Sequence, residues 1–166
     1  DNLLHQISLQ STAQKISLVD ADIVSMIGVL EHLQNPREIL SAISANKNIK
    51  FFYISVPLFS ISVFFEMIFP TVMNRQLSGA HTHLYTEKSL EYMAKEFKFE
   101  NVATWWFGTD MVDLYRSVHV LLDKKNDAKS MTHLWSEMFS SIIDPLQLSL
   151  DKKHLSSEVH MIFRVH

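Results

Sequence analysis

The stretch Asp22-Ile-Val-Ser-Met-Ile-Gly-Val-Leu-Glu-His-Leu-Gln-Asn-Pro36 carries most of the information about the fold. Residues 21–27 are short, apolar and rich in β-branched side chains, which is typical of a buried parallel strand. Gly28 follows at the point where such a strand turns towards a helix. Residues 35–38 (Asn-Pro-Arg-Glu) are a strong helix start, because Asn caps, Pro suits the first helical position and Glu can bond back to the cap. We therefore predict a strand, a turn and a helix in this order.

Strands and helices alternate along the rest of the chain. Further strands are predicted from apolar runs that end at Pro or Gly, or that alternate along one face, over residues 51–56, 102–107 and 158–165. Helices are predicted from caps and apolar spacing over residues 36–43, 64–69, 87–97, 110–122 and 131–143. The first twenty residues are ambiguous, with a strand end at 16–19. This alternation predicts an α/β domain whose sheet is mostly parallel, with about four strands and the last one antiparallel.

Composition excludes several classes of function. The 166 residues suffice for one domain, and we expect a single, partial domain over residues 1–166. A formal charge of −3 gives no basic excess, so nucleic acid is not an expected partner. The absence of Cys excludes disulfides, thiolate metal sites and cysteine nucleophiles. The uncharged run 51–65 is shorter than the roughly 20 residues of a membrane-spanning helix and contains Pro57, so we expect no span and a cytoplasmic protein.

The order of these motifs resembles the class I S-adenosylmethionine-dependent methyltransferases of the type 11/12-like group. The match includes a strand that begins with Asp22, the triplet Leu30-Glu31-His32 and a helix opened by Asn35-Pro36. Residues 51–57 resemble the family's fifth strand, which ends in Pro, and residues 81–90 resemble its short pre-helix motif. Phe97-Lys98-Phe99 departs from the family's Gly-Phe. The resemblance covers about residues 20–107 and implies a Rossmann-like sheet.

The largest departure from the family is the missing glycine-rich cofactor loop. Such a domain begins with a strand and a G-x-G-x-G loop, whereas the glycines of this chain stand at 28, 79 and 108. The chain therefore resembles the C-terminal half of the domain, with strands four to seven. The resemblance implies methyl transfer from S-adenosylmethionine to a small-molecule acceptor, as part of a longer chain. The alternative is a non-catalytic interaction module that keeps half of the fold.

The resemblance also implies site residues at the end of the first predicted strand. Met26, Ile27 and Gly28 would lie against the methionine portion of the cofactor, although Gly28 by itself also suits a tight turn. Glu31 and His32 are the candidate catalytic pair, because a neutral His can act as a general base near neutral pH. The alternative is structural: Glu31 caps backbone amides and His32 hydrogen-bonds a neighbouring loop.

His81 and His83 are candidate substrate-binding residues. Their spacing places two imidazoles on one side of an extended segment, which metals can use. No carboxylate or Cys lies close to them in the sequence, so a metal site is not predicted. We expect the pair to shape the mouth of the substrate site.

The strand at 22–27 also predicts an interaction. In the related sheet this strand is central, and here its outer neighbour is missing. An apolar edge without Pro or Lys is a template for pairing with another chain. We expect the edge to be covered by residues 1–19 folding back, by self-association or by a missing partner segment.

Overall fold

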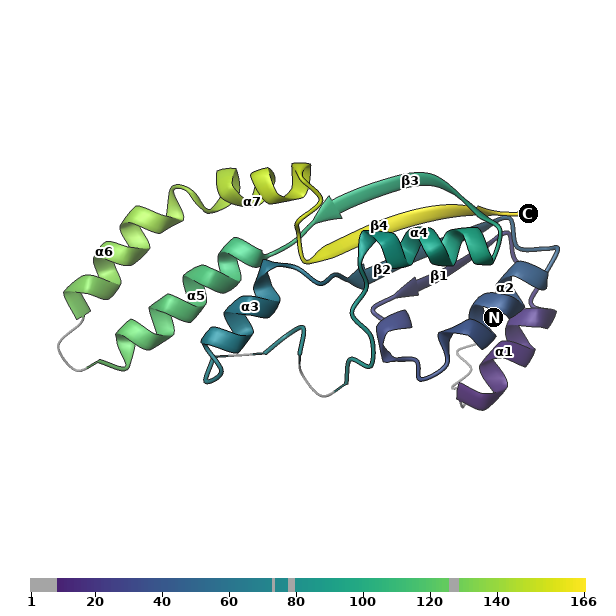
Figure 1. The fold of residues 1–166 in the computed structure, drawn as a ribbon, viewed down its shortest axis with the longest axis horizontal. Helices are drawn as coiled ribbons and strands as arrows, with labels where there is room; N and C mark the ends of the chain where they lie inside the picture. Colours follow the sequence, from purple (N-terminus) through teal and green to yellow (C-terminus); the bar gives the residue numbers. More distant parts are fainter. Residues whose placement is uncertain (1–8, 73, 78–79, 126–128) are drawn as a thin grey trace, which may run out of the picture.

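A single four-stranded sheet organises the chain in the computed structural model, which describes residues 9–72, 74–77, 80–125 and 129–166 (Figure 1). The strands are β1 (Ile23–Ile27), β2 (Phe51–Pro57), β3 (Phe99–Phe107) and β4 (Glu158–Val165), in the spatial order β1-β2-β4-β3. β1 and β2 are parallel, whereas β4 is antiparallel to both β2 and β3. Three strands thus point one way and the last points the other, which confirms the predicted α/β class.

The hydrophobic core lies on one face of this sheet. The register places Phe52 of β2 beside Phe163 of β4, and Ile54 beside Met161. Phe52, Ile54 and Phe163 are completely buried. Helices α1 (Leu9–Leu18), α2 (Pro36–Ala45) and α4 (Glu87–Glu96) contribute to the same core through the buried side chains Ala13, Ile39, Leu40, Ile43, Leu90 and Met93.

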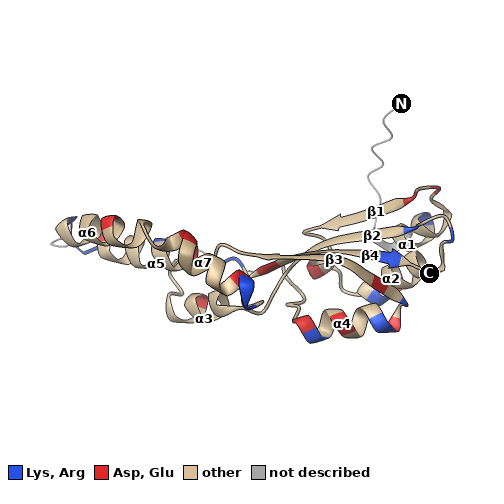
Figure 2. Cartoon of the chain, turned by 90° about the horizontal axis from the view of Figure 1, so that it is seen from above, with Lys and Arg blue, Asp and Glu red and all other residues tan. Residues whose placement is uncertain are grey.

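The opposite face of the sheet remains uncovered by these three helices (Figure 2). Its apolar side chains are strongly exposed: Ile23 and Ile27 of β1 are each 61% exposed, and Trp105 of β3 is 63% exposed. Tyr53 of β2 lies on this face too, because it pairs with Ser25 and with Ile162. Within the part of the chain that the structure describes, the three helices leave this face open and no strand pairs with the outer edge of β1.

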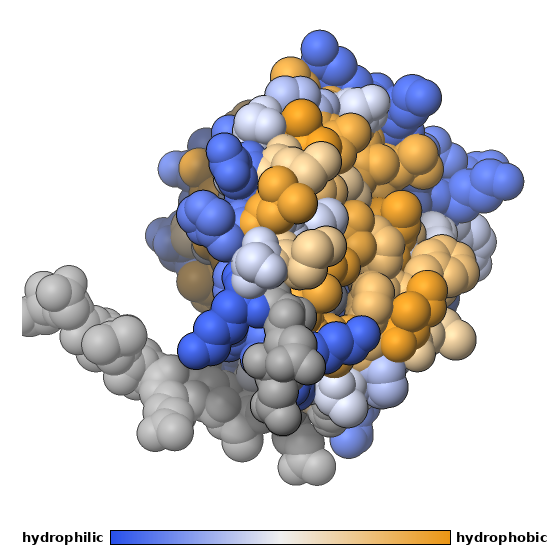
Figure 3. Space-filling view, turned by 90° about the vertical axis from the view of Figure 1, so that its left-hand side faces the viewer, coloured by the Kyte–Doolittle hydropathy of each residue, from blue (hydrophilic) through white to orange (hydrophobic). Residues whose placement is uncertain are grey.

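A helical arm extends away from the sheet (Figure 1). It consists of α3 (Ile61–Ile68), α5 (Asp110–Asp123), α6 (Lys129–Ser140) and α7 (Ile143–Lys152). Figure 3 shows apolar side chains gathered on this end of the molecule, and the exposed ones include Phe64, Met67, Ile68, Met131, Leu134 and Met138. Among the described residues, no helix is both long and apolar enough to cross a membrane.

Three local details differ from the predictions. Residues 16–19 do not form a strand end, because α1 continues to Leu18 and packs on α2. The helix predicted over 131–143 is present as α6 but ends at Ser140, and the unpredicted helix α7 that follows accommodates Pro145 in its first turn, where the backbone N–H has no helical partner. Asn35 precedes α2 as predicted, but its side chain makes no capping bond.

Candidate functional site

The chain turns sharply at the end of β1 and presents two polar side chains there. Gly28 has a φ of +61°, a left-handed conformation that residues with a Cβ rarely adopt. Its N–H donates to the carbonyl oxygen of Ser55 in β2 at 3.1 Å. The one-turn 3₁₀-helix η1 (Leu30–His32) follows and carries Glu31 and His32. The turn thus places both candidate catalytic residues beyond the C-terminal ends of the parallel strands β1 and β2.

A distant segment, residues 80–85, docks on η1. The backbone N–H groups of Thr82 and His83 both donate to the carbonyl oxygen of Glu31, at 2.9 and 3.2 Å. The Thr82 hydroxyl donates to the same oxygen at 2.9 Å. Tyr85 is buried and donates its hydroxyl to the Leu30 carbonyl oxygen, and burial, followed by the nearby Glu31 carboxylate, raises the pKa of Tyr85 to about 12. These bonds fix the segment that carries His81.

Glu31, His32 and His81 converge in one cluster. One ligand atom from each of them, a carboxylate oxygen or a ring nitrogen, lies within 4.8 Å of the other two. The Glu31 Oε1 atom is 3.8 Å from His32 Nε2, and the two imidazole centroids are 4.9 Å apart. Glu31 is only 4% exposed, and none of the described residues gives its Oε2 atom a hydrogen bond. A buried carboxylate oxygen without a partner is costly, so this cluster is suited to a cation or a hydrogen-bond donor.

Both imidazoles of the cluster are held in the same tautomer. His32 Nδ1 lies 2.8 Å from the carbonyl oxygen of Ala80, and His81 Nδ1 lies 3.1 Å from that of Gln76. A carbonyl oxygen only accepts, so Nδ1 must carry the proton in each ring. In the neutral rings the lone pair is therefore on Nε2. This arrangement, with Nδ1–H on a carbonyl and Nε2 free, is typical of histidines that bind metals, and it also suits a general base.

A solvent-open hollow of about 380 Å³ adjoins this cluster. Its lining includes both carboxylates and amides, and the residues are Gly28, Glu31, Ser55, Pro57, Arg75, Gln76, His81 and Glu158. Gln76 is 3% exposed, and its Oε1 atom has no hydrogen-bond partner in the described part of the chain. Ser55 donates its hydroxyl to Glu158 at 2.7 Å. Two residues that line the hollow, Glu31 and Gln76, thus each carry a buried acceptor oxygen to which no described residue donates.

The other candidate residues from the sequence lie at different depths. Gly28 lines the hollow and Ile27 beside it is exposed, whereas Met26 is buried in the core. His83 does not join the cluster; its ring meets the Thr82 hydroxyl and stacks on Tyr85. The predicted loop contact of His32 is confirmed by its bond to Ala80. Within the described residues no backbone amide bonds to the Glu31 carboxylate, so the capping role considered for Glu31 is not observed there.

Sequence reasoning missed Arg75, Gln76 and Glu158 as residues of the site. Each stands in or beside a segment that the sequence marks only as a loop or a strand start. For Arg75 and Gln76, the one signal in the sequence was that they shortly precede His81. Glu158 is far from the other site residues in the sequence and reaches them only because it pairs with Pro57 in the sheet.

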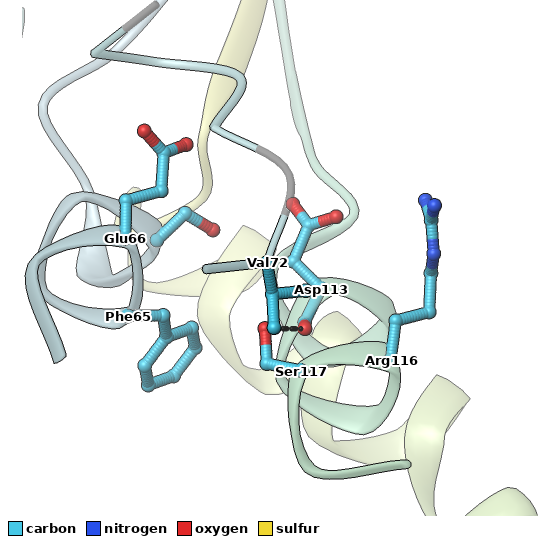
Figure 4. A pocket seen from close by; sticks show the side chains of 7 residues that line it. Phe65, Glu66, Val72, Asp113, Arg116 and Ser117 are labelled. Atoms are coloured by element: carbon cyan, nitrogen blue, oxygen red, sulfur yellow. Dashed lines mark hydrogen bonds between the residues drawn. The ribbon is translucent and has the colours of Figure 1, made fainter. Parts of the chain in front are cut away.

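A second, smaller hollow lies between α3 and α5 (Figure 4). Ser117 donates its hydroxyl to the Asp113 backbone carbonyl at 2.7 Å, which closes one wall. Burial raises the pKa of the Asp113 carboxyl, while the Arg75 guanidinium, 3.6 Å away, opposes this rise. Arg75 also donates to Thr109. Arg75 therefore connects the arm to the hollow beside Glu31.

Comparison with known proteins found no matching family model. The chain is 28% identical, over 122 residues, to the sporulation-killing factor biosynthesis protein SkfC of Bacillus subtilis (strain 168). This alignment covers 73% of the chain and 24% of the Bacillus protein. The chain thus spans about a quarter of the length of this relative.

Similar solved structures include several methyltransferases. The magnesium protoporphyrin IX methyltransferase of Synechocystis PCC 6803 gives a TM-score of 0.49 at 7% identity, over 91% of this chain and 48% of that chain. An S-adenosylmethionine-dependent methyltransferase of Archaeoglobus fulgidus gives 0.47 at 16% identity, over 92% and 64%. Phosphoethanolamine N-methyltransferase 2 of Haemonchus contortus gives 0.42 at 11% identity, over 87% and 33%.

Proposed function

We propose that this chain forms the acceptor side of the active site of an S-adenosylmethionine-dependent methyltransferase. In this proposal, Glu31, His32 and His81 bind a divalent cation beside the methyl acceptor. The observation that carries it is the convergence of these three side chains next to Gly28, beyond the ends of two parallel strands. In open α/β sheets, ligands bind in this position. The motif order in the sequence supports the choice of reaction.

The ligand set of the cluster indicates which cation it would take. Two imidazoles and one carboxylate are the protein ligands of His₂Glu zinc sites, and they also suit iron(II). Ligands at about 2.0–2.1 Å from a tetrahedral ion stand about 3.3 Å apart, so the three side chains must draw closer on binding. A cation bound here would lower the pKa of an acceptor hydroxyl. Glu31 would supply charge, and the two Nε2 lone pairs would supply the neutral ligands.

The cofactor itself fits the chain only in part. Gly28 has an exposed backbone in the hollow, and Ile27 is exposed beside it, so main-chain atoms of this turn can form one wall for the methionine portion. The Met26 side chain is buried, and therefore only its backbone is available. Within this sequence nothing corresponds to the G-x-G-x-G loop. The rest of a cofactor site must then come from other residues of the complete protein.

The cation is tested by calorimetric titration of the chain with zinc chloride. We expect binding, and we expect Glu31→Gln and His81→Ala to weaken it by more than ~100-fold, because outer-shell changes alone cost roughly 10–100-fold. His83→Ala is the matched control, since His83 is close in sequence but lies outside the cluster. Magnesium should bind far more weakly, because it prefers oxygen ligands. Equal zinc affinity of wild type, E31Q and H81A would contradict the proposal.

Titration with S-adenosylmethionine gives a separate prediction. We expect the 166-residue chain to bind the cofactor more weakly than micromolar, because it has neither a glycine-rich loop nor a ribose-binding carboxylate after a second strand. The longer protein that contains the missing strands should bind it well. Micromolar or tighter binding by the short chain would show that the retained wall is sufficient.

A further inference from the structure

Glu66 of α3 holds residues 75–77, a loop segment that borders the hollow beside Glu31. Glu66 is 9% exposed, and its carboxylate accepts three backbone N–H bonds, from Arg75 at 2.8 Å and Gln76 at 2.7 Å on Oε1, and from Leu77 at 2.8 Å on Oε2. Figure 4 shows Glu66 and Phe65 leaving α3 in opposite directions. Three consecutive amides that converge on one carboxylate form an anion-binding nest closed by the protein's own side chain. The backbone of residues 75–77 is thereby fixed to α3.

This loop supplies two oxygens of Gln76 to the candidate site. The backbone carbonyl oxygen accepts the Nδ1 proton of His81 at 3.1 Å, which sets the tautomer of that ring. The Gln76 side chain lines the hollow, and its Oε1 atom is buried and has no hydrogen-bond partner among the described residues. Both oxygens depend on the position of a backbone segment whose amides all bond to Glu66.

We propose that Glu66 is a positioning residue for the cation site, acting through Gln76 on His81; this inference rests on the proposed function. When the Glu66 carboxylate is removed, residues 75–77 lose three bonds and the Gln76 carbonyl no longer holds its place. The His81 ring then loses the acceptor that keeps its proton on Nδ1. A neutral ring with its proton on Nε2 has no lone pair there, so it offers the cation nothing at the cluster.

The substitution Glu66→Gln tests this inference, because Gln keeps the shape and one acceptor oxygen but replaces the other with an N–H₂ group. At least one of the three backbone N–H groups of residues 75–77 then loses its acceptor and faces a donor. We expect the dissociation constant for zinc to rise about 10-fold, as for other outer-shell changes. In metal-free protein, long-range ¹H–¹⁵N spectra should show His81 protonated on Nδ1 in the wild type and a mixture of tautomers in E66Q. Glu137→Gln is the control, since that carboxylate is on the exposed face of α6. Glu66→Asp, which keeps the charge on a shorter arm, should be intermediate.

The tautomer and the affinity separate the outcomes. A changed His81 tautomer together with weaker zinc binding supports the inference, while a loosening of α3 alone would leave the His81 signals unchanged and overturn it. If the wild type binds no zinc, the proposed cation fails, and the metal-free His81 spectra of E66Q still decide whether Glu66 positions the ring. Should E66Q fail to fold, the same spectra of E66D decide, and a wild-type His81 pattern with wild-type zinc affinity there would overturn the inference.

Discussion

Replacing Asp110 by Ala is expected to lower the free energy of unfolding by about 3–5 kcal/mol, the cost of removing one partner from a buried charged network. Asp110 opens α5 and is completely buried. Its Oδ1 atom accepts the hydroxyls of Ser60 and Ser62 at 2.8 and 2.7 Å. Its Oδ2 atom accepts the backbone N–H of Ser157 at 2.9 Å and the Gln147 amide at 3.2 Å. Removal of the carboxyl leaves four donors without this acceptor.

The size of the effect follows from where those donors stand. They belong to the start of α3, to α7 and to the segment before β4, so the Asp110 carboxyl connects the helical arm to the sheet. Each buried donor without a partner costs about 1–3 kcal/mol. Domains of this kind are stable by only about 5–15 kcal/mol, so the loss would be a large fraction of the total.

Urea denaturation followed by far-ultraviolet circular dichroism measures the loss in D110A. Asp123→Ala at the exposed end of α5 is the control and should change stability by less than about 0.5 kcal/mol. Gly108→Ala should act on the same network, because a Cβ there would lie 2.4 Å from Asp110 Oδ2 and 2.8 Å from the Ser157 N atom. Additive losses in the double variant, or a D110A loss below about 1 kcal/mol, would contradict the role of this network.

Regular elements of the fold could be predicted because local signals and tertiary packing agree there. Pro57 ends β2 and Thr86 caps α4, as the sequence indicates, and in the structure Ser89 completes a reciprocal capping box with Thr86. α1 was missed because its inward face consists of only Ala13 and Ile16, which is a weak apolar pattern. The helix is recognisable as part of the core only from its packing against α2. Lys98 shows the opposite case: it replaces the glycine expected at this turn, yet it adopts the left-handed φ of +57° that the turn requires.

The candidate site could be predicted only where its residues are neighbours in the sequence. Glu31 and His32 stand in one motif and meet in the structure as adjacent groups. A metal site at His81 was not predicted, because no carboxylate lies near it along the chain. The carboxylate comes from η1, which reaches His81 only after residues 80–83 bond to the Glu31 backbone. Gln76 and Glu158 enter the site through the same kind of long-range contact, which no local pattern contains.

The second large effect that we expect is self-association through the exposed edge of β1. β1 pairs only with β2 among the described residues, so the amides and carbonyls of its outer side have no strand partner. Residues 9–18 do not cover this edge, because α1 packs on α2, and residues 1–8 lie outside the described part. Cover by residues 1–8, self-association and a missing partner segment therefore all remain as predictions. Self-association is the one that the oligomeric state of the isolated chain tests directly.

We therefore expect the purified chain to run as a dimer or larger species in light scattering, with slowed hydrogen exchange at residues 23–26. Ile23→Lys should convert it to a monomer and speed exchange there, because a Lys on an edge strand opposes strand addition, and the 61% exposed side chain contributes little to the core. Leu18→Lys is the control, since Leu18 is 83% exposed but lies at the end of α1. A stable wild-type monomer with fast exchange along the outer side of β1 would show that this edge remains open. In that case the exposed apolar face with Ile27 and Trp105 would be the remaining candidate for an interaction surface.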